Sequence, residues 1–236
     1  MAERDEGSRG AGVETTALEL RGSRGGADRQ RRFVYRDVGM SVPPGGLAAL
    51  TGIAGSGRTA LLLTLGGRMR PSGGEAVVGG HELPREMRAV QRIAGLGVVA
   101  GVTDLEPALT VREHVSEALD LREGLFGRWR HRARRVQEAL DRVGLDVPPR
   151  TRADDLAPDE ACLLGAALAL VGEPRLLLLD DVDEGLPHDR QRALWERLAA
   201  LAGDVTVLAT CHDPAPAEGL ARIVALPDPH AVEAVR

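Results

Sequence analysis

The chain has 236 residues, a length that fits one domain with a subdomain or two small domains. Its hydrophobic share of 43% and charged share of 28% are those of a folded globular protein and exclude a wholly disordered chain. The net charge of −5 argues against a general nucleic-acid-binding protein, and no apolar run reaches the roughly 20 residues of a membrane-spanning helix.

Strands and helices alternate along most of the chain, which predicts an α/β core with a mostly parallel sheet. Residues 1–15 are polar and rich in Gly, Arg and Glu, and predict a disordered tail that precedes one domain over 16–236. Residues 107–157 have almost no strand character and predict an inserted helical subdomain. The predicted strands are 17–21, 33–37, 39–42, 47–51, 75–78, 95–99, 175–180, 205–210 and 222–226, and the predicted helices are 59–65, 84–91, 111–143 with a break near Gly124 and Gly127, 158–171 and 187–201.

A glycine-rich segment, GIAGSGRT at 52–59, lies between a predicted strand and a predicted helix. It has the spacing G-x-x-x-x-G-K-[ST] of a phosphate-binding loop, with arginine at the lysine position. Glycines let successive N–H groups surround a phosphate, and the helix start adds a positive partial charge. A ligand-free glycine turn is the weaker alternative. The candidate nucleotide-binding residues are Gly52, Ile53, Ala54, Gly55, Ser56, Gly57, Arg58 and Thr59, of which Thr59 is also a candidate Mg²⁺ ligand.

The arginine at position 58 belongs to a wider bias, since all 30 basic residues are arginine and the sequence contains no lysine. Arginine keeps the positive charge but is bulkier and planar. We therefore expect phosphate binding to survive, with less favourable geometry in the transition state.

A second motif is LLLLDD at 176–181, a predicted buried strand that ends in two carboxylates. Ligands of α/β sheets bind at the carboxyl ends of strands, so Asp180 is a candidate to hold Mg²⁺ directly or through water. Asp181 is a candidate to orient or deprotonate an attacking water. An apolar strand followed by acids is common, and its position about 120 residues after a phosphate loop gives it weight.

With these motifs in this order, the chain resembles the ATP-binding cassette (ABC) family of ATPases over nearly its whole length. The segment LTVREHV at 109–115 is similar to the start of the family's helical subdomain, and TVLATCHDP at 206–214 to its switch strand. The resemblance implies an α/β fold: a RecA-like P-loop NTPase core, an N-terminal antiparallel β-subdomain and an inserted helical subdomain. It also places His212 at the histidine that contacts the γ-phosphate.

The sequence departs from the family pattern at several positions. The signature LSGGQ corresponds to LAPDE at 156–160, where Pro158 has no N–H and Asp159 and Glu160 would bring negative charge toward a polyphosphate. Gly101 stands where the family has a glutamine, and Asp181 where it has the catalytic glutamate.

Two further family positions differ. The D-loop aspartate corresponds to Pro187, and no aromatic stands at the adenine-stacking position, for which Phe33 and Tyr35 are substitutes. Aspartate at 181 sets its carboxylate back by about 1.5 Å relative to glutamate, and a displacement of about 1 Å can cost roughly a hundredfold in rate. We therefore expect slow hydrolysis, or none, even where ATP binds.

The resemblance implies an ATP-binding subunit of an ABC transporter, with ATP and Mg²⁺ as cofactors. Its expected partners are a transmembrane permease subunit on a separate chain and a second ATP-binding subunit, as homodimer or heterodimer, with no nucleic acid. The expected location is the cytoplasm, peripheral on the inner face of the cell membrane. The alternative is a non-hydrolysing, ATP-sensing regulatory module of a membrane protein complex; a soluble ATPase acting on nucleic acid or ribosomes has less support because the chain is acidic.

The two cysteines provide no disulfide framework, and no secretory leader is expected from the first residues. Cys211 and His212 resemble a nucleophile–base pair only in sequence, because neighbours on a strand point to opposite faces. We therefore expect Cys211 to be a buried thiol.

Overall fold

The computed structural model describes residues 9–22, 32–123 and 132–231. Two sheets form its framework: an antiparallel sheet in the order β2-β1-β4-β5 and a parallel sheet in the order β6-β7-β8-β3-β9. The strands are β1 (Val13–Gly22), β2 (Arg32–Val42), β3 (Leu47–Thr51), β4 (Gly73–Val78), β5 (His81–Leu83), β6 (Ala94–Leu96), β7 (Leu176–Leu179), β8 (Thr206–Thr210) and β9 (Arg222–Ala225). The helices are α1 (Arg58–Leu65), α2 (Met87–Ile93), α3 (Val111–Glu123), α4 (Arg132–Val143), α5 (Pro158–Val171) and α6 (His188–Leu201).

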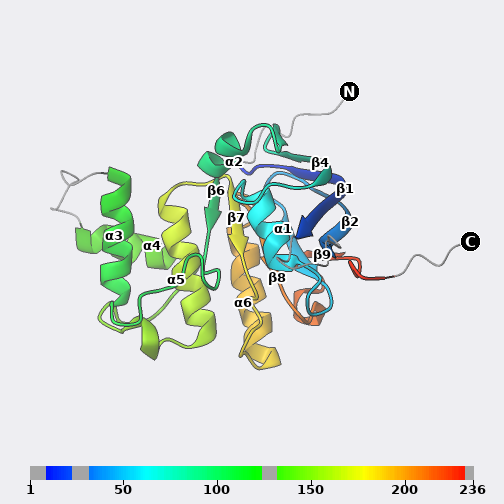
Figure 1. The fold of residues 1–236 in the computed structure, drawn as a ribbon. Helices are drawn as coiled ribbons and strands as arrows, with labels where there is room; N and C mark the ends of the chain where they lie inside the picture. The colour runs from blue at the N-terminus through cyan, green and yellow to red at the C-terminus, as the bar shows by residue number, and fades with distance from the viewer. Residues whose placement is uncertain (1–8, 23–31, 124–131, 232–236) are drawn as a thin grey trace, which may run out of the picture.

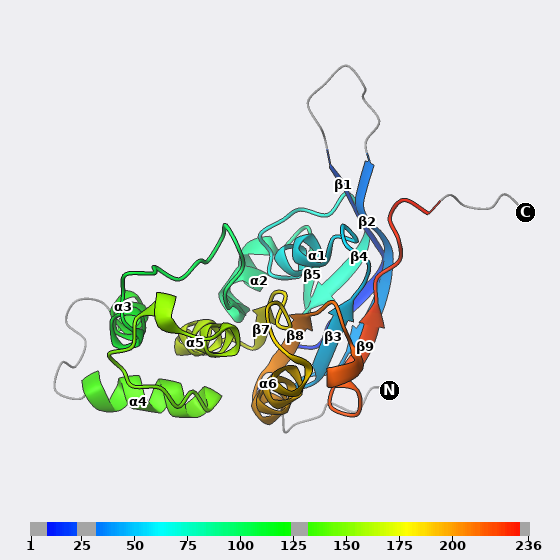
Figure 2. The same ribbon diagram turned by 90° about the horizontal axis from the view of Figure 1, so that it is seen from below.

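The parallel sheet separates two hydrophobic cores, and strand β7 shows how. All four leucines of β7 are buried, as a parallel strand covered on both faces requires. Leu176 and Leu178 pack with α1 and the antiparallel sheet, whereas Leu177 and Leu179 pack with α5 and α6. Figure 2 shows α1 and α6 on opposite sides of the strands. The expected α/β class, with an antiparallel sheet from the N-terminal strands, is confirmed.

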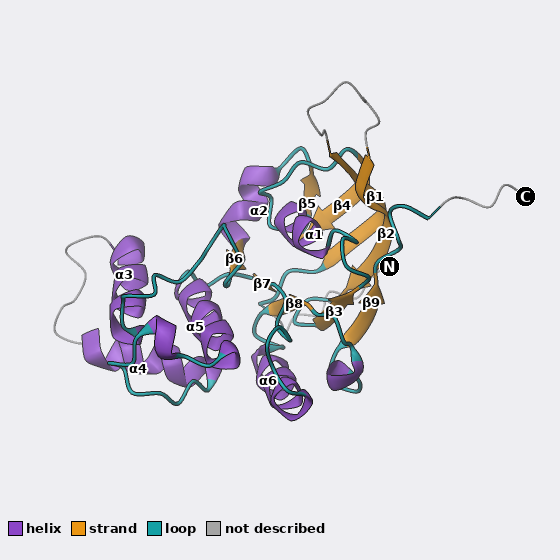
Figure 3. Ribbon diagram, turned by 60° about the horizontal axis from the view of Figure 1, so that its bottom comes forward, coloured by secondary structure: helices purple, strands orange, loops and turns teal. Residues whose placement is uncertain are grey.

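Helices α3, α4 and α5 lie side by side at one end of the molecule, and the antiparallel sheet lies at the other (Figure 1). Figure 3 shows the same division, with α3 and α4 away from the strands. Apolar side chains on facing surfaces, such as Val115, Leu140 and Leu164, join this end to the core behind the parallel sheet. The predicted break between α3 and α4, at Gly124 and Gly127, lies outside the described residues.

The N-terminal residues differ from the expected tail. Residues 1–8 lie outside the described part, but Ala11 is fully buried and its N–H donates to Arg175 O over 2.9 Å. Strand β1 then begins at Val13, which is also fully buried. The prediction of disorder is therefore wrong for residues 9–15, because burial and backbone pairing fix a segment whose composition is polar on average.

Strand β2 runs without interruption through the break predicted between residues 37 and 39. Asp37 has φ 52° and Ala17, on the neighbouring strand, has φ 46°, and the β1–β2 register shifts in this region. The local signal for a break thus corresponds to a bulge, which bends a strand without ending it.

None of the helices within the described ranges combines the length and hydrophobicity needed to cross a membrane.

Candidate functional site

The site lies at the carboxyl ends of β3, β7 and β8, where the loops after three neighbouring parallel strands meet. Residues 52–57 follow β3 and lead directly into α1. Gly55 has φ 81° and Gly57 has φ 86°, a conformation that residues with a side chain rarely adopt. A Cβ at Gly57 would also lie 2.3 Å from the carbonyl oxygen of Val34. Glycine is therefore required at this position by both backbone angle and space.

The loop and the start of α1 form a cradle of N–H groups. The first hydrogen bond within the helix runs from Leu61 N to Gly57 O over 2.8 Å, so the N–H groups of Arg58, Thr59 and Ala60 have no carbonyl partner inside the helix. Such a helix start carries a positive partial charge and binds anions. The Ser56 hydroxyl is buried and has no hydrogen-bond partner among the described residues, as expected where a ligand oxygen completes the cradle. These features fit a phosphate group.

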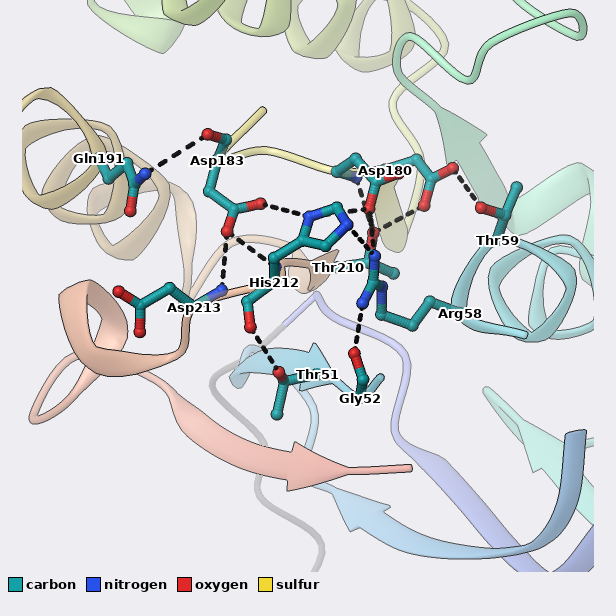
Figure 4. A network of polar contacts seen from close by, with 11 residues as sticks. Thr51, Gly52, Arg58, Thr59, Asp180, Asp183, Gln191, Thr210, His212 and Asp213 are labelled. Atoms are coloured by element: carbon teal, nitrogen blue, oxygen red, sulfur yellow. Dashed lines mark hydrogen bonds and ion pairs between the residues drawn. The ribbon is translucent and has the colours of Figure 1, made fainter. Parts of the chain in front are cut away.

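Three oxygen-bearing side chains lie below the cradle. The Thr59 hydroxyl donates to Asp180 Oδ2 over 2.7 Å, and the Thr210 hydroxyl donates to Asp180 Oδ1 over 2.6 Å (Figure 4). The hard oxygens of a hydroxyl and a carboxylate suit Mg²⁺, which is usually held by one or two protein ligands together with phosphate oxygens and water. Within the described ranges no group of three or more His, Cys, Asp or Glu side chains could hold a metal ion.

The Arg58 guanidinium extends across the mouth of the loop toward the other two strands. Its Nη1 donates to Gly52 O over 2.5 Å, and its Nη2 donates to Asp181 Oδ1 over 3.1 Å. The same Nη2 lies 2.7 Å from His212 Nε2. The side chain is only 8% exposed, so the partners rather than water compensate its charge. Through Arg58, the structure thus brings the candidate residues Asp181 and His212 together with the glycine-rich loop.

Asp181 has its own structural constraint. Its φ is 40°, in the left-handed region that aspartate tolerates better than most residues with a side chain. Its N–H donates to the Thr210 hydroxyl over 2.7 Å, which fixes the turn after β7. The conformation therefore favours aspartate over the longer glutamate that the family has here.

Sequence reasoning missed Asp183, whose side chain is only 4% exposed. Its Oδ2 accepts the backbone N–H of His212 over 2.7 Å and that of Asp213 over 2.8 Å, and its Oδ1 lies 3.4 Å from His212 Nδ1. Thr210, which joins Asp180 and Asp181, was also missed. The available signal was a third acid two residues after Asp181, because acids that follow a buried strand are candidates for the same sheet edge.

The two carboxylates of the signature segment at 156–160 are both bound within the chain. Asp159 makes a two-point ion pair with Arg190 of α6, with N–O distances of 3.1 and 2.7 Å. The Glu160 carboxylate accepts the N–H of Ala157 over 2.8 Å and so caps the start of α5, where Pro158 is the first helical residue. Each carboxylate therefore has a partner within the chain, and the expectation that both bring negative charge toward a bound polyphosphate stays a prediction.

Gly101 and Pro187 occupy two further positions at which the family pattern has polar side chains. Gly101 has φ 73°, and its N–H donates to both carboxylate oxygens of Asp104 over 3.1 and 3.0 Å. Without a side chain it provides no amide for a ligand. Pro187 is the residue before α6 and provides no carboxylate. Both positions therefore lack the polar groups that the family pattern has.

The aromatic substitutes for an adenine contact differ from each other. Tyr35 is fully buried, its hydroxyl donates to Thr64 Oγ1 over 2.8 Å, and burial raises the pKa of Tyr35 to about 12. Stacking on a ligand by Tyr35 is therefore excluded, and that suggestion was wrong. The ring of Phe33 lies against the guanidinium groups of Arg21 and Arg36, 4.6 and 5.0 Å from the ring centroid.

Cys211 is fully buried beside the site, and burial raises the pKa of its thiol to about 12. A thiol with this pKa is not a nucleophile at neutral pH. The expectation that Cys211 is a buried thiol is confirmed.

Comparisons with known proteins agree with this geometry. A family model described as "ABC transporter" matches residues 35–183, more than half of the chain. Nod factor export ATP-binding protein I of Cupriavidus pinatubonensis is 30% identical over 220 residues, which cover 91% of this chain and 64% of that protein. Fe(3+) ions import ATP-binding protein FbpC of Pseudomonas fluorescens is 34% identical over 190 residues, covering 77% of this chain and 51% of that protein. ATP-binding cassette sub-family A member 17 of Mus musculus is 30% identical over 184 residues.

That mouse match covers 78% of this chain, which spans about a tenth of the mouse protein's length. Two solved structures share the fold. A dimeric ATP-binding cassette in a post-hydrolysis state bound to ADP and Pi gives a TM-score of 0.74 at 21% identity, and a dimeric bacterial ABC transporter cassette gives 0.75 at 20% identity. Each match covers 92% of this chain and 95% of the other, which confirms the RecA-like P-loop NTPase core. The chain therefore belongs to the ABC transporter family.

Proposed function

We propose that this chain is the ATP-binding subunit of a transporter, that it binds Mg-ATP through residues 52–59, and that it hydrolyses ATP slowly to drive a separate membrane-spanning partner. The observation that carries the proposal is the position of the Thr59 hydroxyl, 2.7 Å from Asp180 Oδ2, at the start of a helix whose first N–H groups face a glycine loop. Phosphate and Mg²⁺ need these two features side by side.

Each group has a separate role. The N–H groups from Gly55 to Thr59 hold phosphate oxygens, and Thr59 and Asp180 hold Mg²⁺, which offsets the charge of the terminal phosphates when bound. Arg58 transfers its hydrogen bonds from Asp181 and His212 to a terminal phosphate. Asp181 would then orient the attacking water, and His212, which lies beside it, would contact the terminal phosphate.

Slow turnover has two causes in this proposal. Aspartate at 181 places its carboxylate about 1.5 Å further back than glutamate would. Gly101 contributes no side chain, and the loss of one preorganised polar contact costs roughly 10²–10³ in rate. Because such losses are not additive, the two are not multiplied.

One observation favours a second function, a non-hydrolysing ATP-sensing module. Arg58 already pairs with Asp181 over 3.1 Å, so the same contact retained after ATP binding would keep Asp181 from water. ATP would then bind without turnover and act through a change of shape. The two functions share the binding site and differ only in whether Arg58 releases Asp181 to contact water after ATP binds.

The partner and the location are part of the proposal. The bacterial relatives are an export and an import ATP-binding protein, and the solved neighbours are dimers. These names support a permease subunit on a separate chain and a second ATP-binding subunit. The domain would be the expected residues 16–236 extended at its start by residues 9–15, which strand β1 and its buried neighbours add, with a helical subdomain at about 107–157. The permease would hold it on the cytoplasmic face of the membrane.

Calorimetric titration with ATP and steady-state phosphate release together test the proposal. Asp180→Ala serves as the control for contaminating ATPases, because it removes the candidate Mg²⁺ ligand. Phosphate release by the wild type above this control supports the transporter ATPase. Binding with release equal to the control supports the sensing module, and absence of ATP binding overturns both.

A further inference from the structure

The pair formed by Asp183 and His212 is the feature that the proposed roles leave unexplained. Asp183 follows β7 and His212 follows β8, and the two side chains face each other beside Arg58 (Figure 4). A carboxylate with 4% exposure is costly unless several donors compensate its charge. Two backbone N–H groups satisfy Oδ2, and Oδ1 faces the imidazole.

The contacts of the imidazole determine which nitrogen carries its hydrogen. Arg58 Nη2 lies 2.7 Å from His212 Nε2, and a guanidinium nitrogen can only donate. Nε2 must therefore accept, which in a neutral ring leaves the hydrogen on Nδ1. Nδ1 lies 3.4 Å from Asp183 Oδ1 and 3.9 Å from Asp181 Oδ1, so Asp183 is the nearer acceptor. The contacts on both sides of the ring agree on one tautomer.

We infer that Asp183 is a positioning residue for His212: it holds the imidazole in the Nδ1–H tautomer and directs Nε2 toward Arg58 and the phosphate side of the loop. Asp183 itself is held in place from behind. Its backbone carbonyl accepts Leu186 N–H over 3.2 Å and Gln191 Nε2 over 3.4 Å, which ties the turn to α6. A residue that orients another must itself be fixed, and the burial and these bonds provide that.

A purely structural role is the competing explanation. Asp183 could serve only to join the turn after β8 through the N–H groups of His212 and Asp213. Asparagine distinguishes the two roles. Its carbonyl oxygen can still accept backbone N–H groups, but its NH₂ group facing Nδ1 is a donor and requires Nδ1 to accept. The hydrogen then moves to Nε2, opposite the donor of Arg58, or the ring turns away.

The test therefore compares Asp183→Asn with the wild type in protein labelled with ¹⁵N-histidine, without nucleotide and at mildly alkaline pH. The imidazole signals of His212 are assigned by their absence in His212→Gln. We expect a protonated Nδ1 in the wild type and the loss of that pattern in Asp183→Asn. Asp213→Asn is the matched control, because it removes a neighbouring carboxylate that accepts Ala215 N–H and does not contact the ring.

The same positioning role has a kinetic consequence. This second test, unlike the ¹⁵N measurement, rests on the proposed function. We expect kcat for phosphate release to fall roughly 10- to 100-fold in Asp183→Asn, as misplacement of a reacting group does, while the ATP Kd changes less than about threefold. Asp213→Asn keeps both values. An unchanged ¹⁵N pattern in Asp183→Asn overturns the assignment. If the wild type releases no phosphate, the proposed hydrolysis fails, and the ¹⁵N measurement still decides the role of Asp183.

Discussion

The phosphate loop at 52–59 and the signature segment at 156–160 both depart from the family pattern, but in physically different ways. In the loop the change is one side chain, Arg58, on a backbone whose glycines keep the required conformation. In the signature segment the backbone itself changes, because Pro158 removes an N–H and begins α5. The new carboxylates there are bound within the chain, Asp159 by Arg190 and Glu160 by the Ala157 N–H.

The two kinds of change have different consequences for phosphate binding. A phosphate cradle built from N–H groups depends mainly on backbone geometry, so it tolerates a change of cation above it. A segment that must bind a phosphate across an interface depends on its own free N–H groups and charge. In this chain the Ala157 N–H is bound by the Glu160 carboxylate at the start of α5, and Asp159 is bound by Arg190. We therefore expect strong ATP binding in the loop and weak closure through the signature segment.

The largest expected effect is on the cradle. Gly57→Asp should weaken ATP binding more than about 100-fold, because a side chain at φ 86° meets Val34 O and adds a negative charge where a phosphate must lie. Isothermal titration calorimetry measures this. Gly80→Asp is the matched control, since Gly80 also has φ 86° but has open space in the β4–β5 turn. Equal ATP affinity in wild type and Gly57→Asp would contradict the assignment of the loop.

The next prediction concerns closure. Rewriting residues 157–160 as Ser-Gly-Gly-Gln should strengthen ATP-dependent self-association roughly tenfold, because it restores an N–H at 158 and removes two carboxylates from a candidate interface. Analytical ultracentrifugation in an Asp181→Asn background measures the change. The control is the double variant Asp154→Gly with Asp155→Gln, which also removes two carboxylates but leaves Pro158 in place, and it should not strengthen self-association. Tight ATP-driven dimers of the unaltered chain would show that its signature segment is compatible with closure.

A smaller effect tests whether the altered segment is stabilised within the chain. In a double-mutant cycle, Asp159→Asn and Arg190→Gln should show a coupling of about 1 kcal/mol in the free energy of unfolding, since the pair is two-point and Asp159 is only 17% exposed. Urea denaturation provides the four values. The exposed pair of Arg152 and Asp154 is the control and should couple by less than about 0.5 kcal/mol. Equal couplings would mean that the α5–α6 ion pair adds no special stability.

An effect of similar size is expected beneath the cradle, at Tyr35. Tyr35→Phe should lower the free energy of unfolding by about 1 kcal/mol near neutral pH, because the bond to Thr64 is lost. The raised pKa of Tyr35 gives the pH dependence its sign. The folded protein resists ionisation of this phenol, so its contribution is complete below pH 10 and is lost as pH rises toward about 12.

The difference between wild type and Tyr35→Phe in urea unfolding should therefore shrink between pH 10 and 12. Cys162 and Cys211, whose thiol pKa values desolvation also raises to about 12, are present in both proteins and cancel in the difference. A constant difference across this range would mean that Tyr35 ionises as freely in the folded protein as in the unfolded one.

The sequence alone determined the elements that carry the site. The glycine spacing at 52–59, the four leucines of β7 and the Pro158 start of α5 are local signals, because each depends on backbone preference or on burial of neighbouring residues. The α/β class and the family followed from the order of these signals. Local signals were less reliable where tertiary contacts decide: residues 9–15 are ordered by burial, and the break predicted in β2 is a bulge.

Only the tertiary structure decided how the side chains pair. Arg58 reaches Asp181 and His212, which lie 123 and 154 positions away, and Asp159 reaches Arg190 on a different helix. Asp183, after β7, is held by the backbone N–H of His212, which lies in the loop after the neighbouring strand β8. Such pairings depend on strand order, register and helix packing, which bring distant residues within hydrogen-bond distance or leave them apart. A sequence pattern specifies the residue types but not these distances, because the distances are set by the packing of the whole core.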